Sequence, residues 1–216
     1  LQQSNDFQTD LQNLLHDTFK AHQRIIFNGN GYGEDWVQEA QRRGLSNLRD
    51  TVDCMPAYID PKNIRLFAGH NILSETEMRA RYEIHLENYC KVTAIEASTL
   101  RDMVLRGILP AVNRYTADLT QAILHKRELV VPCRVEEDLL QKLSALTGSL
   151  YDTMAAINEA MDKAPDAEGG IDAARYYREE IVRRMEEARQ SIDQLESLTA
   201  AKYWPYPTYA DILFSV

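Results

Sequence analysis

Hydrophobic residues recur at helical spacing along most of this sequence. Near the start they lie three or four positions apart, on one face of a helix that Ser4 or Asn5 would cap and that ends at about His22. That face consists of Phe7, Leu11, Leu14, Leu15 and Phe19. A short amphipathic helix is predicted from about Glu34 to Arg43, and Gly44 would end it.

Two signals set the limits of the next segment. Residues 45–59 are predicted to be mostly irregular, because Pro56 lacks the backbone donor that a helix needs. Asp60 and Pro61 have the residue types of a helix N-cap and first turn, and that helix should end near Gly69. The sequence thus predicts an irregular stretch followed by one short helix.

The longest helical pattern runs from Ser74 to about Lys126. Ser74 and Glu77 have the spacing of a capping box, in which each side chain accepts a hydrogen bond from the other residue's backbone amide. Gly107 and Pro110 interrupt the pattern, and we expect a kink there rather than an end. About fifty helical residues would span about 75–80 Å, which is long for a domain of this size and favours protruding arms.

Two further long helices are predicted. After a turn at 129–134 that contains Pro132, the hydrophobic residues form a narrow seam of the coiled-coil kind, at Leu139, Leu143, Leu146, Leu150, Met154, Ile157 and Met161. After a second turn at 165–170, Asp172 could cap a last helix. The inward residues of that helix would be Tyr176, Ile181, Met185, Ala188, Ile192, Leu195 and Leu198.

No segment alternates between hydrophobic and polar residues over the length of a strand. We therefore predict an all-α fold, a long antiparallel helical bundle with protruding helical arms. Within it, residues 1–73 would be short helices and loops containing glycine and proline, residues 74–202 the bundle, and residues 203–216 an aromatic docking tail. All three parts would belong to one domain.

Composition narrows the classes of function. The 216 residues carry a net charge of -9, which argues against a nucleic-acid partner. No apolar run is long enough to span a membrane, and no signal peptide is recognisable. The three cysteines, Cys54, Cys90 and Cys133, are widely spaced, as in a reducing compartment. We expect a cytoplasmic protein whose short basic pairs, Arg42-Arg43 and Arg183-Arg184, lie on solvated faces.

Three groups of residues could carry chemistry. The glycine-rich loop Asn28–Gly33 could cradle a phosphate ahead of a helix, but it lacks the Lys-Ser/Thr of a P-loop, and a tight turn with positive φ at several glycines is favoured. The metal-binding residue types at Glu83, His85 and Glu87 do not share one helix face. The same holds for the pair His16 and His22. We therefore predict no metal ligands.

The third group is built around Glu96. It lies among apolar residues on the predicted central helix, where a carboxylate needs a partner, and Arg81 or Arg101 could pair with it. A structural ion pair is favoured over catalysis. Cys54 and Cys90 have no arrangement that would activate a nucleophile, and buried packing is the expectation for both thiols. The prediction is that this chain holds no catalytic, cofactor-binding or metal-binding residue.

The C-terminal stretch is dense in aromatic residues. Prolines at 205 and 207 favour an extended path, and hydrophobic residues follow at 212–214. So many rings are not expected to stay in water. The tail could fold back on its own bundle, or it could anchor to another domain or a neighbouring subunit, and the sequence leaves both possibilities open.

Several blocks of this sequence together resemble the C-terminal domain of type III glutamine synthetase. They occur in the family's order and cover nearly the whole chain, at Arg24–Leu45, Arg81–Lys91, Ile108–Val112, Ala174–Val182 and Tyr203–Phe214. The family carries a ligase domain ahead of this region, and nothing in this sequence resembles it. The resemblance therefore implies a fragment of a longer enzyme, an expectation that the absence of an initiator Met supports.

The resemblance also implies a function. The parent would be an ATP-dependent glutamate–ammonia ligase that uses Mg²⁺ or Mn²⁺, and this region would serve structure and subunit assembly without ATP, metal or activity of its own. Its partners would be the catalytic domain and neighbouring subunits, in a ring-shaped dodecamer. The alternative is a self-contained helical-bundle module for protein interactions. A helical-bundle metalloenzyme is disfavoured, because the Glu-x-x-His spacing of di-iron bundles is absent.

Overall fold

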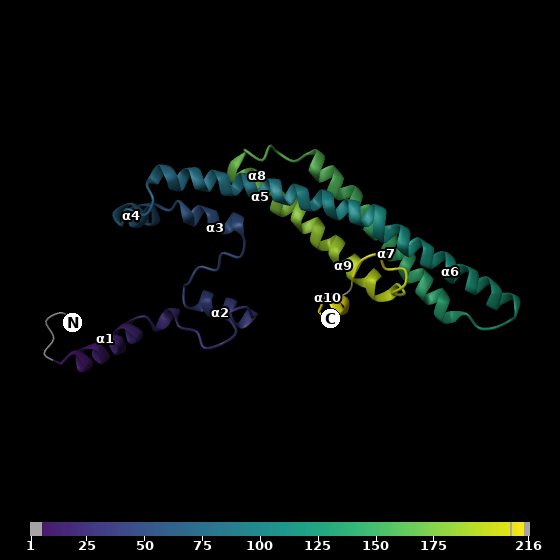
Figure 1. Ribbon diagram of the computed structural model, residues 1–216, viewed down its shortest axis with the longest axis horizontal. Helices are drawn as coiled ribbons and strands as arrows, with labels where there is room; N and C mark the ends of the chain where they lie inside the picture. Colours follow the sequence, from purple (N-terminus) through teal and green to yellow (C-terminus); the bar gives the residue numbers. More distant parts are fainter. Residues whose placement is uncertain (1–5, 208, 214–216) are drawn as a thin grey trace. The chain divides into compact units, whose positions relative to one another are not determined.

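The computed structural model describes residues 6–207 and 209–213, which form helices joined by turns and loops (Figure 1). No strand occurs within these residues, so the predicted all-α class is confirmed. The chain divides into two compact units, Leu1–Asp53 and Cys54–Val216, called unit 1 and unit 2 below. The division of the sequence at residues 73 and 202 stays a prediction.

In its described part, unit 1 contains two complete helices and a single 3-10 turn. These are α1 (Phe7–Ala21), η1 (Gln23–Ile25) and α2 (Glu34–Arg42). A third helix, α3, begins at Thr51, within the last three residues of the unit. The predicted cap at Ser4 or Asn5 is wrong: the carboxylate of Asp6 caps α1 and accepts from the amide of Thr9 at 3.2 Å. Asp6 lies directly before the first helical residue, where a capping side chain can reach the free amides of the first turn.

Helix α3 (Thr51–Tyr58) lies where the sequence predicted irregular chain, and it contains Pro56. Two features offset the missing donor of the proline. The side chain of Asp50 accepts from the amide of Asp53 at 2.8 Å, as an N-cap does. Val52 and Met55 are also buried in the structure. Capping and burial together favour one short helix despite the lost hydrogen bond.

The capping signals at the next two helices are confirmed. In α4 (Pro61–Gly69), the carboxylate of Asp60 accepts from the amide of Lys62 at 2.8 Å. In α5 (Glu75–Met103), the hydroxyl of Ser74 accepts from the amide of Glu77 at 3.3 Å, and the carboxylate of Glu77 accepts from the amide of Ser74 at 2.8 Å. The hydrogen bonds that the Glu77 carboxylate accepts from the amide and the hydroxyl of Ser74 lower its pKa.

The interruption at Gly107 and Pro110 is a π-helical segment. η2 (Val104–Ile108) connects α5 to α6 (Leu109–Glu128) without a break in the helical backbone. The amide of Leu109 donates to the carbonyl of Val104, five residues back. This wider turn changes the backbone pairing just before Pro110, which cannot donate itself. The helix therefore continues past Pro110, as expected, and it does so through one π-helical turn.

Three elements complete the bundle before the tail. They are α7 (Arg134–Asp162), α8 (Gly170–Tyr176) and α9 (Arg183–Leu198), with a second π segment, η3 (Tyr177–Val182), between α8 and α9. Asp172 is not the predicted cap. Gly169 occupies the N-cap position, and Asp172 lies inside the first turn, where its carboxylate pairs with Arg175 at 2.7 Å.

The core of unit 2 lies where its long helices meet. Helix α7 packs against α6 and α9, and α5 packs against α8 and η3 (Figure 1). All seven predicted seam positions of α7 are buried or half-buried, and so are all seven predicted inward positions of the last helix. The bundle is therefore confirmed, with α6 and α7 forming an antiparallel hairpin. No helix in the described residues is both long and apolar enough to cross a membrane.

Candidate functional site

The glycine-rich loop is a turn built by an asparagine. The amide of Tyr32 donates to the side-chain oxygen of Asn30 at 3.0 Å, and the amide of Gly33 donates to its carbonyl at 3.1 Å. The glycines at 29, 31 and 33 do not have positive φ, so that part of the prediction is wrong. Asn30 turns the chain with its own side chain. Two amides that a phosphate would need are used within the loop.

Arg43 holds the segment around this loop together. Its guanidinium donates from Nη1 to the carbonyls of Arg24 and Ile26, at 3.1 and 2.6 Å, and from Nε to Glu39 at 2.5 Å. Phe27 stacks on Trp36 with ring centroids 4.8 Å apart. The prediction of a solvated Arg42-Arg43 pair therefore fails for Arg43. Arg42 and Arg43 together lower the pKa of Glu39 to about 2.

The histidines and glutamates that the sequence offered as metal-binding residue types do not gather at one point. They lie apart from one another or form pairs on the surface. Glu87 pairs with Lys91 one turn along α5, whereas the ring of His85 lies nearly perpendicular to that of Tyr58, with centroids 6.3 Å apart. The Nδ1 atom of His16 lies 3.1 Å from the carboxylate of its neighbour Asp17. Within residues 6–207 and 209–213, no three His, Cys, Asp or Glu side chains are grouped as a metal would require.

Two expectations about buried groups are wrong. Glu96 is exposed on α5, so its carboxylate is solvated and needs no arginine partner. Helix α5 leaves several hydrophobic residues of this region on the surface, Ile95 among them, because α8 and η3 cover only part of it. Cys90 is fully buried as predicted, and burial raises the pKa of its thiol, but Cys54 is exposed.

The first candidate site is the tip of the α6–α7 hairpin, residues 124–135, called the hairpin tip below. It carries exposed hydrophobic side chains at Leu124, Leu129, Val130, Val131 and Val135. Helix α6 ends there in a Schellman motif: the amide of Val131 donates to the carbonyl of Lys126 at 2.8 Å, and that of Val130 to the carbonyl of Arg127 at 3.1 Å.

Val130 has the left-handed backbone of this motif, with φ +57°, and it is 90% exposed. The equivalent positions after α2 and α4 hold Gly44 and Asn71, the residue types that adopt this conformation readily. A β-branched residue there is strained by about 1–2 kcal/mol. The hairpin tip therefore displays a strained, solvent-facing hydrophobic residue that helix termination does not require.

Ion pairs fix the base of the hairpin tip. Arg127 on α6 pairs with Glu137 on α7 at 2.6 Å, and Lys126 pairs with Glu136. The thiol of Cys133 also donates to Glu137. These contacts join the last turn of α6 to the first turn of α7. The hydrophobic side chains are therefore presented on a rigid support.

The backbone strain makes a direct prediction. Val130→Gly should raise the free energy of unfolding of unit 2 by about 1 kcal/mol, because glycine adopts positive φ without steric cost, less its entropy loss on folding. Urea denaturation measures this change. Val135→Gly is the control: the same substitution in the first turn of α7 should destabilise slightly, by about 0.3–0.5 kcal/mol, because glycine is a somewhat poorer helix former than valine. If Val130→Gly were less stable than the unsubstituted chain, the backbone at Val130 would not be strained.

The second candidate site is formed by the C-terminal tail, which folds back on its own bundle. Tyr203 stacks on Tyr115 with ring centroids 5.2 Å apart, and its hydroxyl donates to Asp118. The Tyr206 hydroxyl donates to the carbonyl of Met103 at 3.3 Å and lies where a Cβ on Gly107 would clash. Of the two alternatives, the described part of the tail follows the first. Residues 208 and 214–216 lie outside the described residues.

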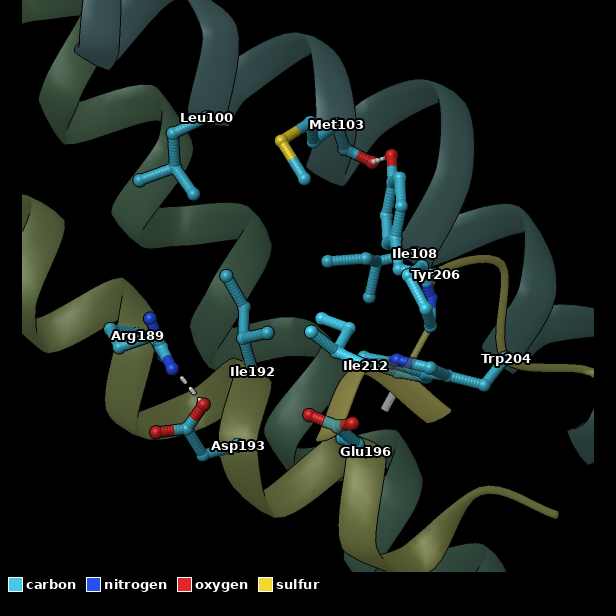
Figure 2. A pocket seen from close by; sticks show the side chains of 11 residues that line it. Leu100, Met103, Ile108, Arg189, Ile192, Asp193, Glu196, Trp204, Tyr206 and Ile212 are labelled. Carbon is cyan, nitrogen blue, oxygen red and sulfur yellow. Dashed lines mark hydrogen bonds and ion pairs between the residues drawn. The ribbon is translucent and has the colours of Figure 1, made fainter. Parts of the chain in front are cut away.

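Between the tail and the bundle lies a pocket of 300 Å³, called the tail pocket below. Figure 2 shows Leu100 and Met103 of α5 at one edge and three charged residues of α9 at the other, with the rings of Trp204 and Tyr206 beside them. The short helix α10 (Tyr209–Leu213) adds Ile212 to its lining. No motif in the sequence marks this site, because its residues come from α5, η2, α9 and the tail, and the α5 residues lie about a hundred positions before the tail.

Comparison with known proteins places these features in one family. Residues 10–127 match the glutamine synthetase C-terminal domain family. Glutamine synthetase of Butyrivibrio fibrisolvens is 35% identical over 98% of this chain and 31% of its own length. Type-3 glutamine synthetase of Dictyostelium discoideum is 31% identical over 96% of this chain and 29% of its own length.

A third relative, glutamine synthetase of Bacteroides fragilis (strain YCH46), is 29% identical over 94% of this chain and 28% of its own length. The chain thus spans about 30% of the length of the curated relatives it matches. The family match covers most of α1 and continues through α2, α3, α4 and α5 to the last turn of α6. It therefore includes the Arg43 contacts and the first helix of the hairpin, α6. With more than half of its residues matched, this chain belongs to the glutamine synthetase C-terminal domain family.

Proposed function

We propose that this chain is the C-terminal helical domain of a type III glutamine synthetase and that it serves subunit assembly rather than chemistry. The parent would be an ATP-dependent ligase that joins ammonia to glutamate in the cytoplasm. The type-3 relative of 31% identity supports the subtype. The observation that carries the assembly role is the hairpin tip, where hydrophobic side chains stand in solvent on a rigid support.

The properties of the hairpin tip suit a docking surface. Leu129 and Val135 are 75% and 74% exposed and flank the strained Val130. Strained backbone that folding does not require is often associated with function. Burying one such aliphatic side chain in a partner contributes about 1.5–3 kcal/mol. A few of them would hold a neighbouring subunit or the catalytic domain firmly.

Helix α1 offers a second surface of the same kind. Its hydrophobic face is exposed at Phe7, Leu14, Leu15 and Phe19, and none of its residues is buried. An amphipathic helix gains most of its stability by burying such a face. We assign this face to a contact with the remainder of the parent protein. ATP and Mg²⁺ or Mn²⁺ would bind in that remainder, and the parent would assemble as a ring-shaped dodecamer.

The test uses the full-length parent with the double substitution Leu129→Ser and Val135→Ser. Sedimentation velocity should show smaller oligomers, because two exposed docking residues are lost from every interface. The matched control is Ile84→Ser with Ile95→Ser, two similarly exposed positions on α5, which should leave the sedimentation profile unchanged. Unaltered assembly of the hairpin-tip variant would refute the role of the hairpin tip.

A second measurement tests whether this region takes part in catalysis. The purified chain of 216 residues should form no glutamine from glutamate, ammonia and Mg-ATP. Glutamine synthesis above a heat-killed control would overturn the assignment of this region as non-catalytic. The alternative, a self-contained interaction module, would replace the proposal if the reading frame of the parent encodes no ligase domain ahead of this region.

A further inference from the structure

The tail pocket has the walls of a small-molecule site. Hydrophobic side chains from three helices and the tail line it, among them Leu100, Met103, Ile108 and Ile192 (Figure 2). The half-buried rings of Trp204 and Tyr206 complete the wall. Its volume of 300 Å³ lies at the small end of the range for ligand pockets, about 300–1,000 Å³. A ligand would have to be small and mostly apolar.

The charges of the tail pocket are unbalanced. Among the lining residues that the structure describes are two acids and one base, Asp193, Glu196 and Arg189, so the formal charge of this described lining is one negative. Arg189 donates from Nε to Asp193 at 2.6 Å, which neutralises that pair (Figure 2). The half-buried carboxylate of Glu196 has no hydrogen bond or ion pair with any residue in the described part of the chain. It is therefore available to a ligand.

We propose that the tail pocket binds a small amphipathic amine, in which one ammonium group is attached to an aromatic or branched aliphatic body. The Glu196 carboxylate would accept the charge-assisted hydrogen bond from the ammonium group. The indole of Trp204 attracts a cation through its face, and the aliphatic lining buries the ligand's hydrocarbon part. An anion of the same shape would meet the negative charge of Glu196 and would bind more weakly.

The experiment uses the fluorescence of Trp204. The chain has two tryptophans, Trp36 and Trp204, so Trp36→Phe leaves the pocket indole as the single reporter. Titration with 2-phenylethylammonium should change its emission saturably, with a dissociation constant of about 0.1–1 mM, as expected for so few heavy atoms. The matched anion, 3-phenylpropionate, should bind at least about tenfold more weakly, because it cannot pair with a carboxylate.

Two variants test the role of Glu196. In the same background, Glu196→Gln should weaken binding of the amine about tenfold, the loss expected for one charge-assisted contact. Glu186→Gln changes the net charge equally on the exposed side of α9, outside the pocket lining, and should leave the affinity unchanged. The melting temperatures of both variants should equal that of the Trp36→Phe chain, since glutamine has nearly the same shape as the glutamate it replaces.

Each other outcome overturns the proposal. No saturable change means that the pocket does not take the amine. Equal binding of the amine and the acid, or equal affinities of the two variants, means that Glu196 does not recognise the charge. An emission change that follows protein concentration without any probe means that a second copy of the chain fills the pocket. Assembly of the parent does not enter this experiment, so its failure leaves the proposed function standing.

Discussion

Leu150→Ala should lower the free energy of unfolding of unit 2 by about 3–4 kcal/mol, more than any of the surface substitutions proposed for this chain. Leu150 is fully buried in the middle of α7, where that helix meets its neighbours. Truncation removes three carbons and leaves a cavity that long packed helices cannot easily close. Urea denaturation followed by Trp204 emission, in the Trp36→Phe background, measures the loss.

The same helix provides the control. Val135 is 74% exposed in the first turn of α7, so Val135→Ala should change the stability by no more than about 0.5 kcal/mol. If Leu150→Ala also changed it by less than about 1 kcal/mol, the side chain would not be a core residue, and the packing of α7 against α6 and α9 would be wrong.

Arg43→Ala should destabilise unit 1 by about 2 kcal/mol, because one guanidinium bonds to two backbone carbonyls and to Glu39. Its loss would leave the carbonyls of Arg24 and Ile26 without their donor and would free the chain on both sides of the glycine-rich loop. Trp36, stacked on Phe27 within this segment, reports on it. Denaturation would be followed in a Trp204→Phe background.

Arg42 gives a close comparison for this prediction. It pairs with the same carboxylate, Glu39, but its side chain is 72% exposed, and within the described residues it bonds to no distant carbonyl. Arg42→Ala should therefore cost less than about 1 kcal/mol, as exposed ion pairs do. Equal losses for the two variants would show that the carboxylate pair, and not the contact with the loop backbone, stabilises unit 1.

The parts of the fold that depend on residues close together in the sequence could be predicted. The capping residues Asp60 and Ser74 act locally, and the hydrophobic seam of α7 follows from helical spacing alone. Helix α3 could not be predicted, because burial of Val52 and Met55 outweighs the proline. No residue pattern in the sequence indicated the π segment η3, since tertiary packing decides where an α-helix changes to π-helical hydrogen bonding.

The candidate sites were less predictable than the fold. The left-handed backbone of Val130 contradicts the residue's own preference, so no reading of propensities would place it there. The tail pocket joins Met103 to Tyr206, which are 103 positions apart. Which of two allowed surfaces an aromatic tail covers depends on the shape of the bundle, and that shape appears only after the helices pack.

The late position of the tail in the sequence has a consequence for folding during synthesis. Every other element of the tail pocket, from α5 to α9, is translated before Tyr203. The α6–α7 hairpin rests on contacts between neighbouring helices and can form early, whereas the tail adds contacts of long sequence separation. We therefore expect the bundle to emerge from the ribosome with this side still open, and closure of that side by the tail to be a late step of folding in this region.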